Sequence, residues 1–196
     1  MARFEEYLSV LAGDFTGKNV IEPDEFPQLA LYADQVAEFF SSRLDLDDKK
    51  PAITKNMISD YVKKGLIPPP DKKRFDRDHI IMIWFILFLK MAYRPKDVEA
   101  VMKPFVENIE SRFDEKFNFT ELYEKLGPVF TAQSRESADR ALATVDTVKE
   151  AIRETGVDDD DSIELFLVLT SIAIQADTAM SIGRNLLREF FAPEEK

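Results

Sequence analysis

The sequence predicts a mainly α-helical protein, and three observations support this fold class. Apolar side chains recur at helical spacing along most of the 196 residues. Strand-like alternation between turn signals is scarce, and only six glycines are spread over the chain. Hydrophobic residues make up 45% of the composition, which is sufficient for a buried core. An all-α fold is therefore expected.

The first 43 residues are expected to form two helices. Residues 1–12 carry apolar side chains on one face, and residues 28–43 carry a second apolar stripe that includes Leu29 and Tyr32. A loop with two prolines and four acidic residues separates them at 13–27. The charged segment 45–51 follows as a linker.

The middle of the chain has clear signals for the start and end of a helix. Thr54 is a preferred N-cap for a helix through Lys64, and Gly65 stands where the end of a helix favours a left-handed residue. The prolines at 68–70 cannot continue a helix, and they predict an extended arm.

Two more helices are expected before residue 107. Asp76 is a suitable N-cap for a helix over 77–91, whose sequence is apolar on all sides. A helix of this kind is buried in the core of a protein. Arg94 and Pro95 end it, and residues 96–106 form a short helix.

The C-terminal part of the chain is expected to be a helical hairpin. Residues 107–127 have no clear period, whereas a polar helix is expected over 130–154 and a strongly apolar one over 162–191. A short turn between two helices implies that they are antiparallel. The expected organisation is thus an N-terminal helix and loop at 1–27, a domain at 28–106 and a helical region at 107–196.

One segment of this acidic protein is basic. Residues 49–77 hold nine Lys or Arg against three Asp, which gives a local charge of +6 within a net charge of −11, so the rest of the chain carries −17. A concentrated basic patch is typical of nucleic-acid binding, whereas the acidic remainder is repelled by phosphate. The alternative is a solvated loop that offsets the acidity of the protein.

The composition excludes several kinds of site. Cysteine is absent, which excludes disulfides and thiolate metal sites, and the single histidine, His79, excludes sites with several histidines. The acidic run 158–161 lacks the spacing of a calcium-binding loop. No glycine-rich phosphate loop and no defined pair of carboxylates is present. We therefore expect no cofactor, no metal and no enzymatic activity.

The N-terminus and the apolar runs bear on localisation. The first residues lack the pattern of a secretory signal. The longest uninterrupted apolar run, residues 80–89, is about half as long as the roughly 20 residues that a bilayer requires. We expect a cytoplasmic protein without a membrane span.

The basic segment resembles the winged helix-turn-helix domain of the MerR regulators. Residues 61–68, YVKKGLIP, resemble the end of the family's recognition helix and its turn, and residues 72–76, KKRFD, resemble its basic wing. Residues 94–98, RPKDV, resemble the start of its second short helix. More narrowly, the chain resembles a bacterial family of domains of unknown function, numbered 1836, with such a MerR-like domain. Ser59 and Asp60 depart from the MerR pattern, which usually has arginine and tyrosine there.

The resemblance implies that residues 28–106 form a winged helix-turn-helix domain, with helix 54–64 in the major groove and the wing 68–77 on phosphates. Serine, threonine, asparagine and lysine side chains on the helix face are able to bond to base edges. An ordinary polar helix face is the alternative. The expected contacts to double-stranded DNA are Thr54, Lys55, Asn56, Ser59, Tyr61, Lys63, Lys64, Lys72, Lys73, Arg74 and Arg77.

The apolar stripe of the last helix is too wide for one polar partner helix to cover, so either a second chain or the domain at 28–106 covers the rest, and we expect a homodimer. The function expected is that of a DNA-binding transcriptional regulator, with an unidentified small-molecule effector as a further partner. The alternative is a helical protein-interaction or small-ligand module whose basic domain does not bind DNA. The residues expected at the dimer interface are Leu165, Phe166, Leu169, Ile172, Met180 and Leu187.

Overall fold

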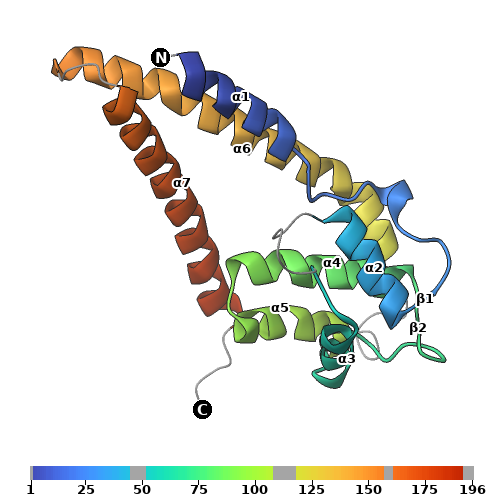
Figure 1. The fold of residues 1–196 in the computed structure, drawn as a ribbon. Helices are drawn as coiled ribbons and strands as arrows, with labels where there is room; N and C mark the ends of the chain where they lie inside the picture. The colour runs from blue at the N-terminus through green and yellow to red at the C-terminus, as the bar shows by residue number, and fades with distance from the viewer. Residues whose placement is uncertain (1, 45–51, 108–117, 157–160, 192–196) are drawn as a thin grey trace. The chain divides into compact units, whose positions relative to one another are not determined.

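The computed structural model describes residues 2–44, 52–107, 118–156 and 161–191. These residues form seven α-helices, one short 3-10 helix and a two-stranded sheet, so the mainly α fold is confirmed (Figure 1). The linker expected at 45–51 and the acidic run at 158–160 lie outside the described residues. The elements are α1 Ala2–Phe15, η1 Pro23–Glu25, β1 Leu31–Tyr32, α2 Ala33–Arg43, α3 Lys55–Lys63, β2 Arg74–Phe75, α4 Arg77–Ala92, α5 Pro95–Glu107, α6 Phe119–Thr155 and α7 Asp161–Phe190.

The chain divides into two compact units. The first, called the helical unit here, comprises Met1–Val20 and Pro128–Gly183. The second, called the head, comprises Ile21–Gly127 and Arg184–Lys196. The head contains the whole of the domain that the sequence analysis drew at 28–106, together with seven residues before it and the start of α6 after it.

The core of the head forms around α4. Eight of its residues, from His79 to Leu87, are buried, as expected for a helix that is apolar on all sides. The only tryptophan of the chain, Trp84, is 2% exposed and packs against Phe88 and Tyr123, with ring centroids 4.4 and 4.9 Å away. Tyr123 also donates a hydrogen bond of 2.7 Å to the carbonyl of Ile21. This aromatic cluster joins three separate segments of the head.

The helix predicted from residue 28 begins instead at Ala33, so its first five residues were wrongly assigned. Leu31 and Tyr32 pair with Phe75 and Arg74 in an antiparallel sheet. The apolar period of residues 28–43 does not reveal strand partners 42 and 44 residues away. Leu29, which the pattern placed on the apolar face, is 80% exposed.

The helix predicted over 130–154 begins eleven residues earlier, at Phe119. The side-chain oxygen of Asn118 accepts a bond of 2.9 Å from the amide of Glu121, and the carboxylate of Asp78 on α4 accepts bonds from the amides of Phe119 and Thr120. These acceptors satisfy the free N–H groups of the first turn. One of the two caps comes from a distant helix, which explains why the local pattern gave no clear assignment.

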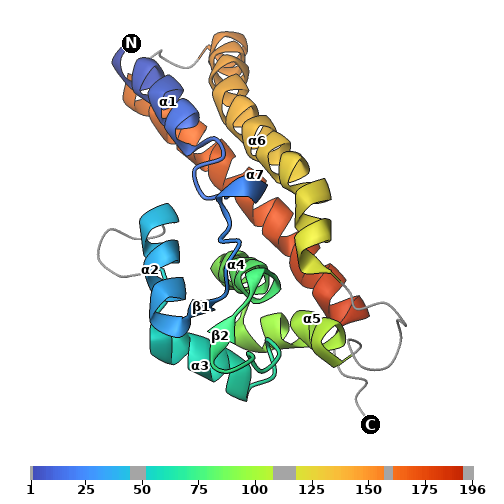
Figure 2. The ribbon, with the colours of Figure 1, turned by 90° about the vertical axis from the view of Figure 1, so that its right-hand side faces the viewer.

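The helical unit consists of α1, the later part of α6 and most of α7. Val145, Val148 and Ile152 of α6 pack with Val168 of α7 and with side chains of α1. Gln175 on α7 donates a 3.0 Å hydrogen bond to Thr144 on α6, so the contacts run in opposite directions along the two helices. The predicted antiparallel arrangement is therefore confirmed for this unit (Figure 2).

One buried acid lies inside the helical unit. Glu164 is fully buried, and its carboxylate is 3.8 Å from the ammonium of Lys149, which also bonds to Glu5 on α1. The bond to Glu5 raises the pKa of Lys149 above its ordinary value. The lysine therefore stays charged at neutral pH and offsets the cost of burying Glu164.

The apolar side chains of α7 are largely uncovered within the chain. Phe166, Leu169, Ile174 and Leu186 are between 54% and 65% exposed. By length and composition this helix is able to cross a membrane, and only 6% of its most apolar window is buried. The longest uninterrupted apolar run of the sequence lies in the buried helix α4, so run length alone does not indicate this feature of α7.

Candidate nucleic-acid interface

Helix α3 has the ends that its sequence predicts. The Thr54 hydroxyl accepts a bond of 3.3 Å from the amide of Met57, which caps the first turn. Gly65 has φ +67°, its amide bonds to the carbonyl of Val62, and the amide of Leu66 bonds to the carbonyl of Tyr61. These two bonds form a Schellman motif, which a side chain with a Cβ would strain. The helix is therefore fixed at both ends.

One face of α3 is buried and the other is polar. Ile58 and Tyr61 are buried inside the head. The exposed residues are Lys55, Asn56, Asp60, Lys63 and Lys64. Ser59 is partly buried and donates its hydroxyl to the carbonyl of Lys55 at 3.0 Å. The exposed face therefore carries four of the eleven residues that the sequence analysis assigned to DNA, namely Lys55, Asn56, Lys63 and Lys64.

Two of the assigned residues are used inside the head instead. Tyr61 is 5% exposed, and its hydroxyl accepts a bond of 2.9 Å from Lys90 on α4. The guanidinium of Arg77 donates to Glu124 at 3.0 Å and to the carbonyl of Pro23. Both side chains hold elements of the head together, and neither is free to reach a ligand. The hydroxyl of Thr54 likewise accepts a hydrogen bond as the N-cap of α3.

The segment 68–77, called the wing here, contains a tight turn at its tip. The amide of Arg74 bonds to the carbonyl of Asp71 at 2.7 Å, and the two central residues, Lys72 and Lys73, have φ values of +46° and +66°. Two successive positive φ angles define a type I′ turn, which favours Asn-Gly. Lysine is an uncommon choice at these positions, and it displays two charges at the tip.

Replacing Lys72 and Lys73 with Asn and Gly is expected to stabilise the head and to weaken DNA binding. Left-handed backbone costs a residue with a Cβ about 1 kcal/mol, so the free energy of unfolding rises by about that amount. Loss of two phosphate contacts makes the slope of log affinity against log salt shallower by about 2. Urea unfolding, followed by Trp84 fluorescence, measures the first effect. The matched variant Lys72→Ala/Lys73→Ala loses the same charges and gains no stability.

Helix α3 and the wing line one hollow of about 370 Å³, called the α3–wing hollow here. Three lysines stand on its walls, Lys55 and Lys63 from α3 and Lys73 from the wing, against one carboxylate, Asp34. The structure thus brings together cations from two segments that the sequence analysis treated separately. The remaining lining residues are Tyr32, Ala33, Ser59, Val62, Pro70 and Phe75.

Several cations of this face, including Lys63 of the hollow, form weak, exposed pairs. Lys63 lies 3.7 Å from Asp60, and Lys64 lies 3.4 Å from Glu99. The guanidinium of Arg74 stands over the ring of Tyr32, 5.3 Å from its centroid, and a hydrogen bond with Tyr32 raises the pKa of Arg74. Exposed pairs contribute little to stability and are screened by salt, so these cations are available to a polyanion at small cost.

Tyr32 and Phe75 were not among the predicted site residues, although both line the hollow. The sequence contained a signal for Phe75, since the Arg-Phe pair was matched to the wing. Tyr32 was assigned to the apolar face of a helix, and only its pairing with Arg74 in the sheet places it at the site.

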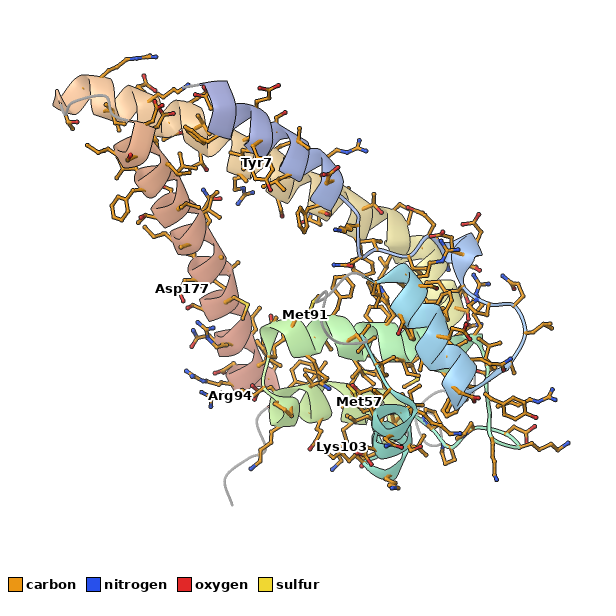
Figure 3. The ribbon with its side chains drawn as sticks, viewed as in Figure 1. Tyr7, Met57, Met91, Arg94, Lys103 and Asp177 are labelled. Carbon is orange, nitrogen blue, oxygen red and sulfur yellow. The ribbon has the colours of Figure 1, made fainter. Side chains whose placement is uncertain are left out.

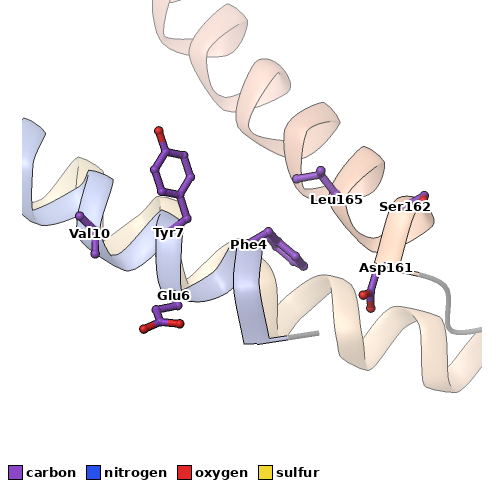
Figure 4. Close-up of a pocket in the computed structure, with 7 residues that line it drawn as sticks. All are labelled: Phe4, Glu6, Tyr7, Val10, Asp161, Ser162 and Leu165. Carbon is purple, nitrogen blue, oxygen red and sulfur yellow. The ribbon is translucent and has the colours of Figure 1, made fainter.

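A second hollow of about 720 Å³ lies in the helical unit, between α1 and the start of α7 (Figure 4). Phe4, Tyr7 and Val10 of α1 and Leu165 of α7 give it an apolar lining. Tyr7 is 63% exposed and projects from α1 (Figure 3). The described residues contain no cluster of three or more His, Asp or Glu able to hold a metal ion.

A family model described as "Domain of unknown function (DUF1836)" matches residues 21–126. The chain belongs to this family. The matched region coincides with the continuous part of the head, Ile21–Gly127, so the DUF1836 domain includes η1, the sheet and the first turns of α6. No curated protein and no solved structure matches the chain.

Proposed function

We propose that the DUF1836 domain of this protein binds double-stranded DNA as part of a transcriptional regulator. The observation that carries the proposal is the α3–wing hollow, whose walls combine three lysines from α3 and the wing. The order strand, helix, helix, wing, helix, helix from β1 to α5 supports the resemblance to the MerR domain. In this arrangement α3 enters the major groove and the wing follows the phosphates.

The proposed contacts fall into two groups. On α3, Lys55, Asn56, Ser59 and Lys63 face base edges, because their side chains are donors and acceptors suited to the major groove. Lys64, Lys72, Lys73 and Arg74 face phosphates, which supply affinity without reading sequence. Thr54, Tyr61 and Arg77 position these residues by capping α3 and bracing the head.

Asp60 and the acidic remainder of the chain limit non-specific binding. The net charge of −11 repels phosphate over most of the surface, so only the basic face is attracted to DNA. Asp60 is exposed on α3, and its carboxylate is able to accept a hydrogen bond from a cytosine amino group. A selective regulator benefits from both effects, because competing genomic sites are numerous.

We also propose that the protein is a homodimer through α7. Apolar or small residues alternate at spacings of four and three along this helix, which is the heptad pattern of a coiled coil. Most are exposed, and the small ones lie in the middle, where they allow two helices to approach closely. A twofold dimer presents two heads to two half-sites. The heptad residues are Leu165, Leu169, Ile172, Ala176, Ala179, Gly183, Leu186 and Phe190.

Leu169→Glu is expected to convert the dimer to a monomer. Leu169 is 58% exposed on the heptad stripe, so a charge there is tolerated in a monomer and opposed by its counterpart in a dimer. Light scattering should give twice the 22.5 kDa of the chain for the wild type, and 22.5 kDa for the variant. Ile174→Glu, 62% exposed on the opposite side of α7, is the matched control and should stay dimeric. A monomeric wild type at tens of micromolar contradicts the proposal.

The second candidate function is a protein-interaction module whose head does not bind DNA. The apolar hollow beside α1 and the uncovered face of α7 favour it, because large exposed apolar surfaces mark interaction sites. Purification with a stoichiometric protein partner, together with no DNA affinity that depends on salt, distinguishes it from the proposed regulator.

Selection from a random duplex library tests the DNA-binding proposal. The full chain is incubated with duplexes of about 30 random base pairs at about 150 mM salt, and the bound fraction is sequenced over several rounds. We expect enrichment of two inverted half-sites about one helical turn apart. A bound pool with the composition of the input, or no bound pool, contradicts sequence-specific regulation.

A further inference from the structure

The α3–wing hollow has the size of a small-molecule site. Its volume of about 370 Å³ falls at the lower end of the range of ligand cavities, about 300–1,000 Å³. Its walls come from four segments, namely the end of β1, the start of α2, the outer face of α3 and the wing. The hollow is therefore formed by the fold of the head and not by one flexible loop.

The lining of the hollow combines apolar side chains with lysines. Val62, Pro70 and Phe75 supply apolar surface, and Phe75 is held in place by its burial, at 4% exposed. The ammonium groups of Lys55, Lys63 and Lys73 outnumber the carboxylates of Asp34 and of Asp60, which pairs with Lys63 at 3.7 Å, so a local charge of +1 remains. An apolar body matches the apolar side chains of the lining, and an anionic group matches its lysines. A neutral apolar ligand makes no use of the lysine charges, and inorganic phosphate leaves the apolar side chains uncovered.

We propose that the α3–wing hollow binds a small amphiphilic organic anion, a carboxylate or sulfonate on an aromatic or aliphatic body. The hydroxyl of Tyr32 stands at the same hollow and is able to donate to the anionic group. The ligand is proposed to enter the hollow as the fold forms it, so that binding requires no conformational change elsewhere in the chain.

The ligand and DNA exclude one another, and this part of the inference rests on the proposed function. Lys55, Ser59, Lys63 and Lys73 line the hollow and also belong to the proposed DNA contacts. An anion held among them neutralises the lysines of the hollow and fills the space between α3 and the wing. DNA affinity then falls in proportion to ligand occupancy, so the anion is an effector that releases the protein from DNA.

Nuclear magnetic resonance on the full chain tests the site, with 8-anilino-1-naphthalenesulfonate as the probe. We expect amide shifts at Tyr32, Ser59, Lys63, Lys73 and Phe75 that saturate with probe concentration. The double variant Lys63→Ala/Lys73→Ala should raise the dissociation constant by about tenfold or more. The control Lys96→Ala/Lys103→Ala removes the same charge from α5 and should leave it unchanged. Mapping individual amides separates this site from probe bound to the exposed face of α7.

Three outcomes overturn the site: shifts confined to other parts of the chain, equal affinity in the two double variants, or equal affinity for neutral N-phenyl-1-naphthylamine. Competition is measured separately, with a labelled duplex from the selection. Probe that saturates the hollow without releasing this duplex overturns the exclusion. A chain that binds the probe at the hollow and binds no DNA at low salt contradicts the proposed function and leaves the anion site standing.

Discussion

Replacing Lys72, Lys73 and Arg74 with glutamate is expected to lower the affinity for DNA by about 100-fold or more at low salt. The three side chains are exposed on the wing, where each is proposed to neutralise a phosphate. Reversal of their charges removes these contacts and adds three repulsions. Fluorescence anisotropy with a labelled duplex measures the change, and circular dichroism verifies that the helices are retained.

A matched variant separates the local effect from the change in net charge. Replacing Lys96, Lys103 and Lys125 with glutamate alters three exposed lysines of α5 and α6. Each triple variant replaces three positive charges with three negative ones, so its net charge is −17 in place of −11. We expect the control to bind DNA within about fivefold of the wild type, because distant exposed charges are screened by salt. Equal losses in both variants rule out the wing as the contact surface.

Tyr123→Ala is expected to lower the free energy of unfolding of the head by about 3–5 kcal/mol. Its ring is 0% exposed and contacts Phe26 and Trp84 at centroid distances of 4.9 Å, so truncation leaves a large cavity. Burial raises the pKa of the Tyr123 phenol, so the folded state favours the neutral form and loses stability at strongly alkaline pH. Urea unfolding measures the loss, with Trp84 as the only tryptophan reporting on the head.

Two further variants divide the contribution of Tyr123. Tyr123→Phe keeps the ring and removes the bond to the Ile21 carbonyl, so a loss of about 1 kcal/mol is expected. Leu126→Ala, at a residue of the same helix that is 37% exposed, should cost much less than Tyr123→Ala. If Tyr123→Ala costs no more than Leu126→Ala, the start of α6 does not pack on α4 as described.

The local signals of the sequence predicted the elements of the head that depend on caps and on continuous apolar pattern. Thr54, Gly65 and Asp76 end or start helices where the chain predicts, because each satisfies or terminates backbone bonds of its own helix. The burial of α4 followed from an apolar sequence without a polar face. These features depend on residues within about one helical turn of the boundary, so no tertiary information was required.

The elements that depend on distant partners were not predictable in the same way. The strand at Leu31 exists because Phe75 pairs with it, and the start of α6 is fixed by Asp78 from another helix. The candidate site shows the same division. The sequence identifies its lysines by their charge, whereas Tyr32 lies at the hollow only because it pairs in the sheet. Arg77 is bound to Glu124 within the head. A pattern of charge identifies cations but does not tell which of them are already bound within the fold.

The most direct test of the central claim is the anisotropy of a labelled pool of genomic fragments with the pure wild-type protein, at about 50 and 200 mM salt. The proposed regulator binds at the lower salt and loses at least about tenfold in affinity at the higher one, because counterions are released from the phosphates that the wing contacts. Absence of binding at both salt concentrations contradicts DNA recognition by the head. It would make the uncovered face of α7 the surface through which the protein acts.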